Sequence, residues 1–150
     1  MRIPVRMFFL LALTAAVWAA APARAAEPEV ALVKTVEGAA VAVRGEARLP
    51  LAVGTPVLLH DAVETAEGSV GLTFKDGTRI SLGPRSRLEL KNYAFAPAER
   101  DLDFLVGLVR GTMLYVSGLI AKLAPDRARV ETPVATVAVR GTRFAASVPE

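Results

Sequence analysis

The stretch that most constrains the fold of this chain runs from Thr132 to Ala145. It carries β-branched valines at short intervals, and these residues favour extended backbone packed in a sheet. Pro133 also pushes the residue before it away from helical backbone angles. The stretch is therefore predicted as one long strand, with β-structure as the framework of the chain.

The alternation of faces within this stretch is broken once. Val137 and Val139 share one face of an ideal strand, whereas Phe144 falls on the other. One extra residue near Gly141 restores the alternation, so the pattern predicts a β-bulge at residues 140–142.

Arg140 lies beside this predicted bulge, next to the expected core. A guanidinium there needs a hydrogen-bonded acidic partner. Asp61 and Asp76, both in earlier turns, are the candidate partners. The alternatives are an arginine at the edge of a core strand and an arginine that binds a ligand or a partner protein.

The rest of the chain after residue 26 is divided by Gly and Pro turn signals into short apolar segments, typical of an all-β sandwich, roll or compact barrel. Residues 117–123 could form one helical turn capped by Ser117, or could continue a strand. The expected strands are 30–36, 40–44, an edge strand around Pro50, 57–59, 62–65, the hairpin 69–82, 88–95 with a bulge near Lys91-Asn92, and two short strands within 102–115.

The hairpin from Ser69 to Leu82 can be assigned a register. A two-residue turn at Asp76-Gly77 would mix apolar and polar side chains on each face. A three-residue loop, 75–77, instead pairs Phe74 with Thr78, and keeps the apolar side chains of both strands on one side. We therefore expect the longer loop, with Gly77 in a left-handed conformation.

The first 25 residues have the pattern of a secretory signal peptide. A charged segment with Arg2 and Arg6 precedes an apolar run, and Ala23-Arg24-Ala25 is a small-x-small cleavage site. Cleavage is expected between Ala25 and Ala26, leaving one β domain over residues 26–150 in the periplasm or secreted. The run is short for a membrane span, although retention as an anchor stays an alternative.

Charge and cysteine content narrow the function classes. Three of the 18 basic residues lie in the expected signal, which leaves 15 basic and 15 acidic residues. A net charge near zero argues against binding to nucleic acid or to an anionic membrane. The chain has no cysteine, so disulfides and thiol chemistry are excluded.

The residue pattern favours a protein that is not an enzyme and has no cofactor or metal. His60 is the single histidine and is expected on the surface or in a turn, and no serine sits in a nucleophile-elbow pattern. Asp101 and Asp103 share a strand face. We interpret them as solvent-exposed residues at the edge of a loop rather than as a catalytic acid–base pair. The basic residues 127, 129, 85 and 87 are expected as solvated charge, and Tyr93, Phe95 and Tyr115 as core residues.

The stretch from Thr132 to Phe144 resembles the signature of the FecR domain, the family named for the iron-dicitrate transport regulator. Upstream segments fit the same pattern in the same order, so the resemblance covers about Val33 to Ala145. These segments are 38–41, 61–65 with 68–70, 72–78 and 108–111. The motif positions, taken as structural, are Thr132, Pro133, Thr136, Val139, Arg140, Gly141, Thr142 and Phe144.

The resemblance implies a periplasmic β-rich module. In signalling members of the family the module passes a signal from an outer-membrane transporter to a cytoplasmic sigma factor. This chain has no segment ahead of the signal that could grip a sigma factor, and it ends at Glu150 soon after the motif. We therefore expect a free-standing exported domain.

Two function classes remain. The first is a sensory or regulatory component that binds another envelope protein, with a sheet edge near Pro50 or the final strand as the binding route. The second is a structural or glycan-binding module of the cell envelope.

Overall fold

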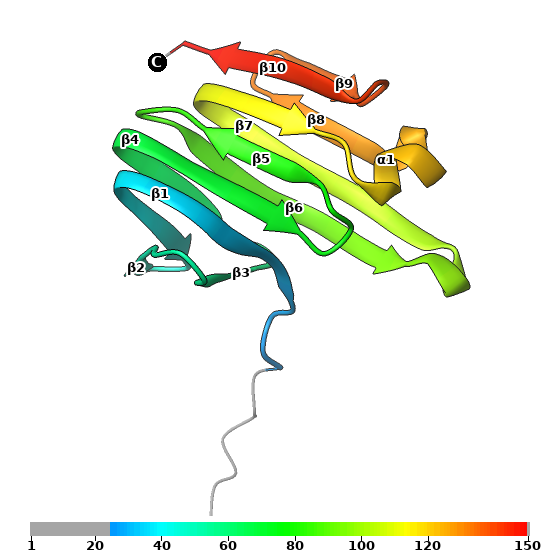
Figure 1. The fold of residues 1–150 in the computed structure, drawn as a ribbon, viewed down its shortest axis with the longest axis horizontal. Coiled ribbons are helices and arrows are strands. Elements are labelled where there is room, and N and C mark those ends of the chain that lie inside the picture. The colour runs from blue at the N-terminus through cyan, green and yellow to red at the C-terminus, as the bar shows by residue number, and fades with distance from the viewer. Residues whose placement is uncertain (1–24, 150) are drawn as a thin grey trace, which may run out of the picture.

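The computed structural model describes residues 25–149, and all ten of its strands belong to one sheet (Figure 1). The expected signal peptide lies almost wholly outside these residues. The strands are β1 (Glu29–Arg44), β2 (Ala47–Pro50), β3 (Pro56–Leu58), β4 (Ala62–Phe74), β5 (Arg79–Leu82), β6 (Arg87–Ala96), β7 (Asp101–Val116), β8 (Ala128–Thr132), β9 (Ala135–Ala138) and β10 (Arg143–Val148). The all-β prediction is confirmed.

The sheet is organised around three long strands. β1 pairs with β2 and β3 on one side and with β4 on the other. β5 and β6 lie one after the other between β4 and β7, and each of them pairs with both of these strands. The far side of β7 pairs with β8 in parallel and with β10 in antiparallel direction, and β9 pairs with β8.

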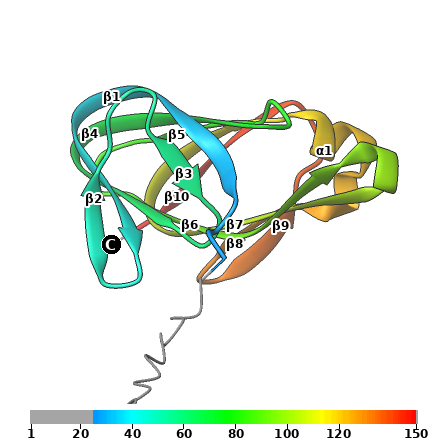
Figure 2. The same cartoon turned by 90° about the horizontal axis from the view of Figure 1, so that it is seen from below.

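The sheet curls strongly, so that one face turns inward and forms the core (Figure 2). Burying that face removes apolar side chains from water, which is the main favourable contribution to folding. A chain of aromatic rings runs through it, in which Phe104 packs edge-on against both Phe74 and Tyr115. Tyr115 and Phe104 are the largest fully buried side chains.

Three predicted strand divisions are wrong. The segment 62–65 and the first strand of the hairpin, which begins at Ser69, belong to the single strand β4. The segments 30–36 and 40–44 form the single strand β1, although bulges interrupt its register near Lys34 and Ala39. The segment 102–115 is likewise one strand, β7, because Gly107 and Gly111 stay inside its ladder. Long strands that bend at such points can follow the curl of the sheet.

The hairpin between β4 and β5 has the predicted register. Val70 pairs with Leu82 and Leu72 with Ile80, and the amide of Phe74 donates to the carbonyl oxygen of Thr78 at 2.8 Å. Gly77 has a φ of 84°, the left-handed conformation expected for the three-residue loop. The predicted bulge in β6 near Lys91-Asn92 and the edge position of the strand that contains Pro50 are also confirmed.

A short helix, α1 (Leu119–Leu123), confirms the helical alternative for residues 117–123. Two 3-10 turns, η1 (Pro97–Glu99) and η2 (Pro125–Arg127), accompany it. The predicted capping by Ser117 is wrong: Gly118 holds the N-cap position, and the Ser117 hydroxyl donates to the carbonyl oxygen of Gly141 instead. No helix within residues 25–149 is long and apolar enough to cross a membrane.

Asp76 fixes this helix to the β4–β5 loop. Its buried carboxylate accepts hydrogen bonds from the amide and hydroxyl of Thr78, from the Tyr93 hydroxyl and from the amide of Ile120. Its backbone carbonyl oxygen accepts from the amide of Leu119 at 2.9 Å. The carboxylate therefore ties three distant segments together and satisfies the free N–H groups at the start of the helix.

Candidate binding surface

The motif from Thr132 to Phe144 forms a hairpin followed by a connecting segment that crosses from β9 to β7, not the predicted single strand. β8 and β9 are joined by a two-residue turn, and the Thr132 hydroxyl closes it by hydrogen bonds with the amide and carbonyl groups of Ala135. Val134 lies in this turn and is 93% exposed. Pro133 therefore begins a tight turn, consistent with its fixed φ angle.

The second half of the motif carries the chain from β9 to β7. Val139 is buried, and its amide donates to the carbonyl oxygen of Ala128 at 2.8 Å. Residues 139–142 lie outside any strand, so the predicted β-bulge is wrong, although Gly141 does adopt a positive φ of 119°. Phe144 then stacks on Tyr115 with ring centroids 5.0 Å apart, which anchors β10 to β7.

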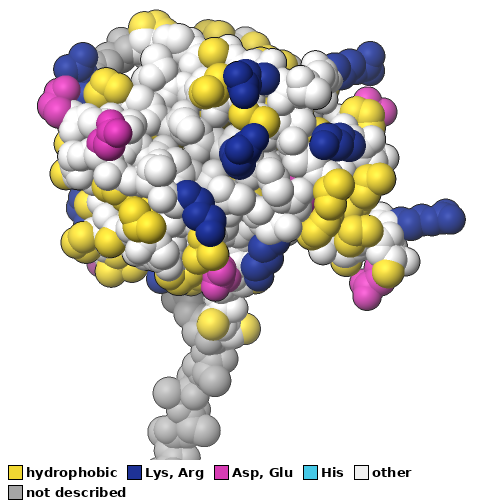
Figure 3. Space-filling view, in the orientation of Figure 1, with side chains coloured by type: hydrophobic (Ala, Val, Ile, Leu, Met, Phe, Trp, Pro, Cys, Tyr) yellow, Lys and Arg dark blue, Asp and Glu magenta, His cyan; other side chains and the backbone are white. Residues whose placement is uncertain are grey.

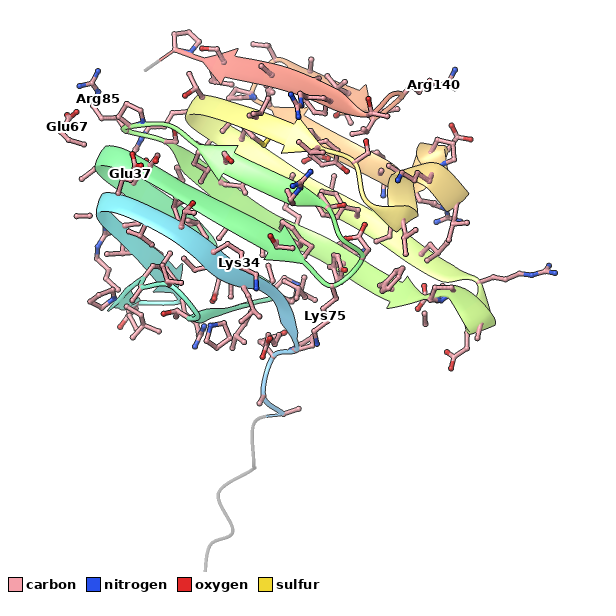
Figure 4. The ribbon with its side chains drawn as sticks, in the orientation of Figure 1. Lys34, Glu37, Glu67, Lys75, Arg85 and Arg140 are labelled. Atoms are coloured by element: carbon pink, nitrogen blue, oxygen red, sulfur yellow. The ribbon has the colours of Figure 1, made fainter. Side chains whose placement is uncertain are left out.

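Arg140 is not held against the core. Its side chain is 80% exposed, and its guanidinium lies 3.5 Å from the carboxylate of Asp126, itself 85% exposed. The carboxylates of Asp61 and Asp76, the predicted partners, accept hydrogen bonds from other groups. The prediction failed because it depended on the continuous strand; in the structure Arg140 lies on the crossing segment instead (Figure 4).

Asp61 is the buried partner of a different arginine. Arg44, at the end of β1, donates from Nε and Nη2 to its two carboxylate oxygens at 2.8 and 2.7 Å. The amide of Leu58 adds a third hydrogen bond at 2.9 Å. The hydrogen bond to Asp61 raises the pKa of Arg44 above its ordinary value, as expected for a charge-assisted pair.

β10 leaves one edge of the sheet open. Within residues 25–149 it pairs only with β7, through six residues from Arg143 to Val148. The amide of Ser117 donates to the carbonyl oxygen of Thr142, which sets the hydrogen-bonded positions of the ladder. By the antiparallel alternation, Arg143, Ala145 and Ser147 direct their backbone N–H and C=O groups away from β7.

The outer face beside β10 carries small and hydroxyl-bearing side chains around Leu114, and most of its exposed lining is apolar. An open groove of about 470 Å³ lies there. Its outward-facing lining includes Ser69, Ser81, Gly83, Thr112, Leu114, Ala145 and Ser147. Two of these positions are tightly fitted, because a Cβ built on Gly83 would lie 2.2 Å from the Thr112 hydroxyl oxygen.

The register brings two arginines of distant segments onto this face. Arg79 of β5 and Arg143 of β10 both pair with Val116 of β7, one from each side. Cross-strand partners point to the same side of a sheet, so both arginines lie on the outer face. Arg79 follows the polar side of the predicted hairpin register, whereas the position of Arg143 was not predicted, because residues 132–145 were expected to form one long strand.

A comparison with known families decides where this chain belongs. The model of the FecR protein family matches residues 61–150. The chain belongs to the FecR family. Searches of curated proteins and of solved structures found no significant match.

The FecR match begins at Asp61 and therefore spans β4 to β10. β1, β2 and β3 precede it in sequence, yet β1 pairs with β4 along almost the whole length of both strands. The sequence resemblance described above begins near Val33. Part of it therefore lies in β1, which precedes the residues that the FecR model matches.

The remaining candidate residues of this FecR protein do not assemble into a catalytic arrangement. His60 lies in a turn with a positive φ of 67°, and its Nδ1 is 3.2 Å from Glu27. Asp101 is exposed, whereas Asp103 accepts hydrogen bonds from Asn92 and Arg129. No group of three metal-ligating side chains occurs among the described residues.

Charges on the flank near β2 are mutually paired in this FecR domain. Arg48 and Arg87 both donate to Glu64, and Arg87 also contacts Glu89. Burial raises the pKa of Glu64, but the two hydrogen-bonded arginines outweigh it and hold that pKa below its ordinary value. The predicted solvated arginine at position 87 is therefore half-buried and ion-paired.

Proposed function

We propose that this FecR-family chain is an exported, non-enzymatic module with a sensory or regulatory role, and that it binds another envelope protein through β10. FecR proteins are generally regulatory or sensory domains in membrane-linked signalling. The observation that carries the proposal is the open edge of β10. An extended segment of a partner could pair there as an additional strand.

The other edges of the sheet are protected against such pairing. β2 is four residues long and carries Arg48 and Pro50, and β3 is three residues long and begins with Pro56. β9 is also only four residues long. Short length, charge and proline are the usual means of blocking a sheet edge, whereas β10 offers six residues without proline.

The alternation of β10 specifies the partner segment. Phe144, Ala146 and Val148 pack against the core and remain partly exposed at the edge, so an added strand would place apolar side chains beside them. Its other side chains would lie beside Arg143, Ala145 and Ser147, where small or acidic residues fit. The partner segment is therefore a strand in which apolar residues alternate with small or acidic ones, with an acidic residue near Arg143.

Two substitutions at one position test this route. Ala145→Pro removes an outward N–H and leaves the hydrogen bonds to β7 in place, whereas Ala145→Val keeps that N–H. A photo-crosslinking amino acid at Ser147, introduced into the full chain in cells, reports contact at the edge. We expect a cross-linked envelope protein with Ala145→Val and its loss with Ala145→Pro.

Mass spectrometry of the cross-link should place it in an extended, alternating segment of the partner. If Ala145→Pro fails to fold, Ser147→Pro removes the next outward N–H, with the cross-linker moved to Arg143. Equal cross-linking in the proline and valine variants, or no cross-linked protein in either, would contradict binding at this edge.

A further inference from the structure

The outer face of the sheet carries a band of cationic side chains that crosses the strands. Arg143 lies on β10 and Arg79 on β5, in the row that continues to Thr73 on β4. Lys34 on β1 and Lys75 in the β4–β5 loop lie farther along the same face (Figure 4). In the space-filling view the dark blue side chains form a band across this face (Figure 3). We define residues 34, 75, 79 and 143 as the cationic band.

These four cations differ from most other charges of the protein. Within residues 25–149 none of them forms an ion pair or a side-chain hydrogen bond, whereas the arginines near β2 are paired with carboxylates. Glu37 and Glu67 lie at the opposite end of the face (Figure 4). Acidic side chains also lie on this face (Figure 3), but the four unpaired cations gather in the band and produce a local positive potential there.

The spacing of the band follows from the sheet. Neighbouring strands are about 4.8 Å apart, so Arg79 and Arg143, which flank β7, are roughly 10 Å apart at their backbones. Lys34 lies two strands beyond Arg79, on β1. The cations therefore recur at similar intervals across a rigid surface, an arrangement that fits a linear polymer with repeated negative charges.

The side chains that surround the cationic band indicate which class of anionic partner fits it. The neighbouring row across five strands consists of Thr35, Gly71, Ser81, Leu114 and Ala145. Leu114, 40% exposed, is the one large apolar side chain in this row. A protein interface relies on buried aromatic or other large anchors, and an interfacial membrane site relies on bulky apolar side chains. Neither is provided here.

We infer that the cationic band and the adjoining groove bind an acidic polysaccharide. Guanidinium and ammonium groups would pair with carboxylate or phosphate groups along the chain of sugars. The hydroxyl groups of Ser81, Thr112 and Ser147, which line the groove beside the band, would exchange hydrogen bonds with sugar hydroxyls. This site does not depend on strand addition at β10.

Polygalacturonate, a polymer of uronic acid, is a direct probe. The full chain is expressed and purified, and its affinity for immobilised polygalacturonate is measured at low and at physiological salt, with neutral dextran of similar length as the reference. We expect binding to polygalacturonate alone, weakened by salt because the charges are exposed.

Charge variants locate the site. Arg79→Gln combined with Arg143→Gln should weaken polygalacturonate binding about tenfold, the sum of two exposed charge contacts. The matched control, Arg100→Gln combined with Arg110→Gln, removes the same charge away from the band and should leave the affinity unchanged. Arg79→Gln alone leaves the β10 edge intact, so its effect separates this site from the proposed protein-binding edge.

Three outcomes would overturn the inference. The first is the same loss of affinity in the control pair. The second is polyglutamate binding as tight as polygalacturonate binding with the same dependence on Arg79, which would identify an acidic protein as the partner. The third is binding to phosphatidylglycerol vesicles without binding to polygalacturonate, which would identify a membrane surface.

Discussion

Gly38 of β1 and Gly68 of β4 lie directly opposite each other, and neither position has room for a side chain. A Cβ on Gly38 would lie 2.1 Å from the carbonyl oxygen of Glu67, and a Cβ on Gly68 would lie 2.0 Å from that of Glu37. Both glycines have positive φ angles, 71° and 135°. This pair lets the two long strands approach and bend together where the register of β1 shifts.

Substituting either glycine should destabilise the domain strongly. Gly68→Ala adds a methyl group against a backbone carbonyl that cannot move without disrupting the ladder, and it also strains the backbone. We expect a loss of about 3 kcal/mol in the free energy of unfolding, measured by chemical denaturation.

Gly45→Ala is the control for backbone strain alone. Gly45 also has a positive φ, 59°, but nothing lies within 4 Å of a Cβ built there. The strain of a left-handed alanine should reduce the free energy of unfolding by about 1 kcal/mol. Equal losses for Gly45→Ala and Gly68→Ala would show that the close approach of β1 and β4 is not required.

The glycine pair also explains which strands could be predicted from the sequence. The β4–β5 hairpin was predictable because its alternation and Gly77 lie within 14 neighbouring residues, 69–82. Gly38 looked like the end of a strand because its partner, Gly68, is distant in sequence. Strand ends that depend on a remote partner have no local signal.

The same limit applies to the binding surface. The motif from Thr132 to Phe144 identified the family, but the turn at Pro133 was overlooked in favour of the β-branched residues around it. The pairing of β10 with β7, and with it the row that joins Arg79 to Arg143, depends on a contact between distant segments. The cationic band could therefore be recognised only in the folded chain.

Removing the Asp76 carboxylate should destabilise both α1 and the β4–β5 loop. Asp76→Ala leaves the amides of Thr78 and Ile120 and the hydroxyl of Thr78 without their acceptor in a buried environment. We expect a loss of about 3 kcal/mol or more, measured by thermal and chemical unfolding. Asp101→Ala, at an exposed position, should change stability by less than about 0.5 kcal/mol. Similar stability of both variants would exclude Asp76 as the anchor of the helix.

Arg44 and Arg140 should respond very differently to substitution. Arg44→Ala leaves the buried carboxylate of Asp61 without its bidentate partner, although the amide of Leu58 and water entering beside the half-exposed arginine limit the loss. We expect a loss of about 2 kcal/mol for Arg44→Ala and less than about 0.5 kcal/mol for Arg140→Ala in chemical denaturation. The opposite ranking would restore Arg140 as the structural arginine of the family motif.

Two core tyrosines should make the fold sensitive to high pH. Burial raises the pKa of Tyr115 to about 12. Burial is also the main cause of the raised pKa of Tyr93, and the negative charge of the nearby Asp76 adds to it. The unfolded chain ionises its tyrosines near pH 10 and so binds fewer protons than the native state above that pH. The free energy of unfolding should therefore be retained below pH 10 and lost as the pH rises from 10 towards 12.

The slope of this loss can be assigned to one residue by substitution. Each tyrosine should contribute roughly 1.4 kcal/mol for each pH unit in that window. The Tyr115 hydroxyl is buried and has no hydrogen-bond partner among residues 25–149, so Tyr115→Phe should preserve stability at pH 7 and make the decline above pH 10 shallower. Denaturation series at several pH values for both proteins provide the measurement. Identical slopes above pH 10 would show that Tyr115 ionises as readily in the native protein as in the unfolded chain.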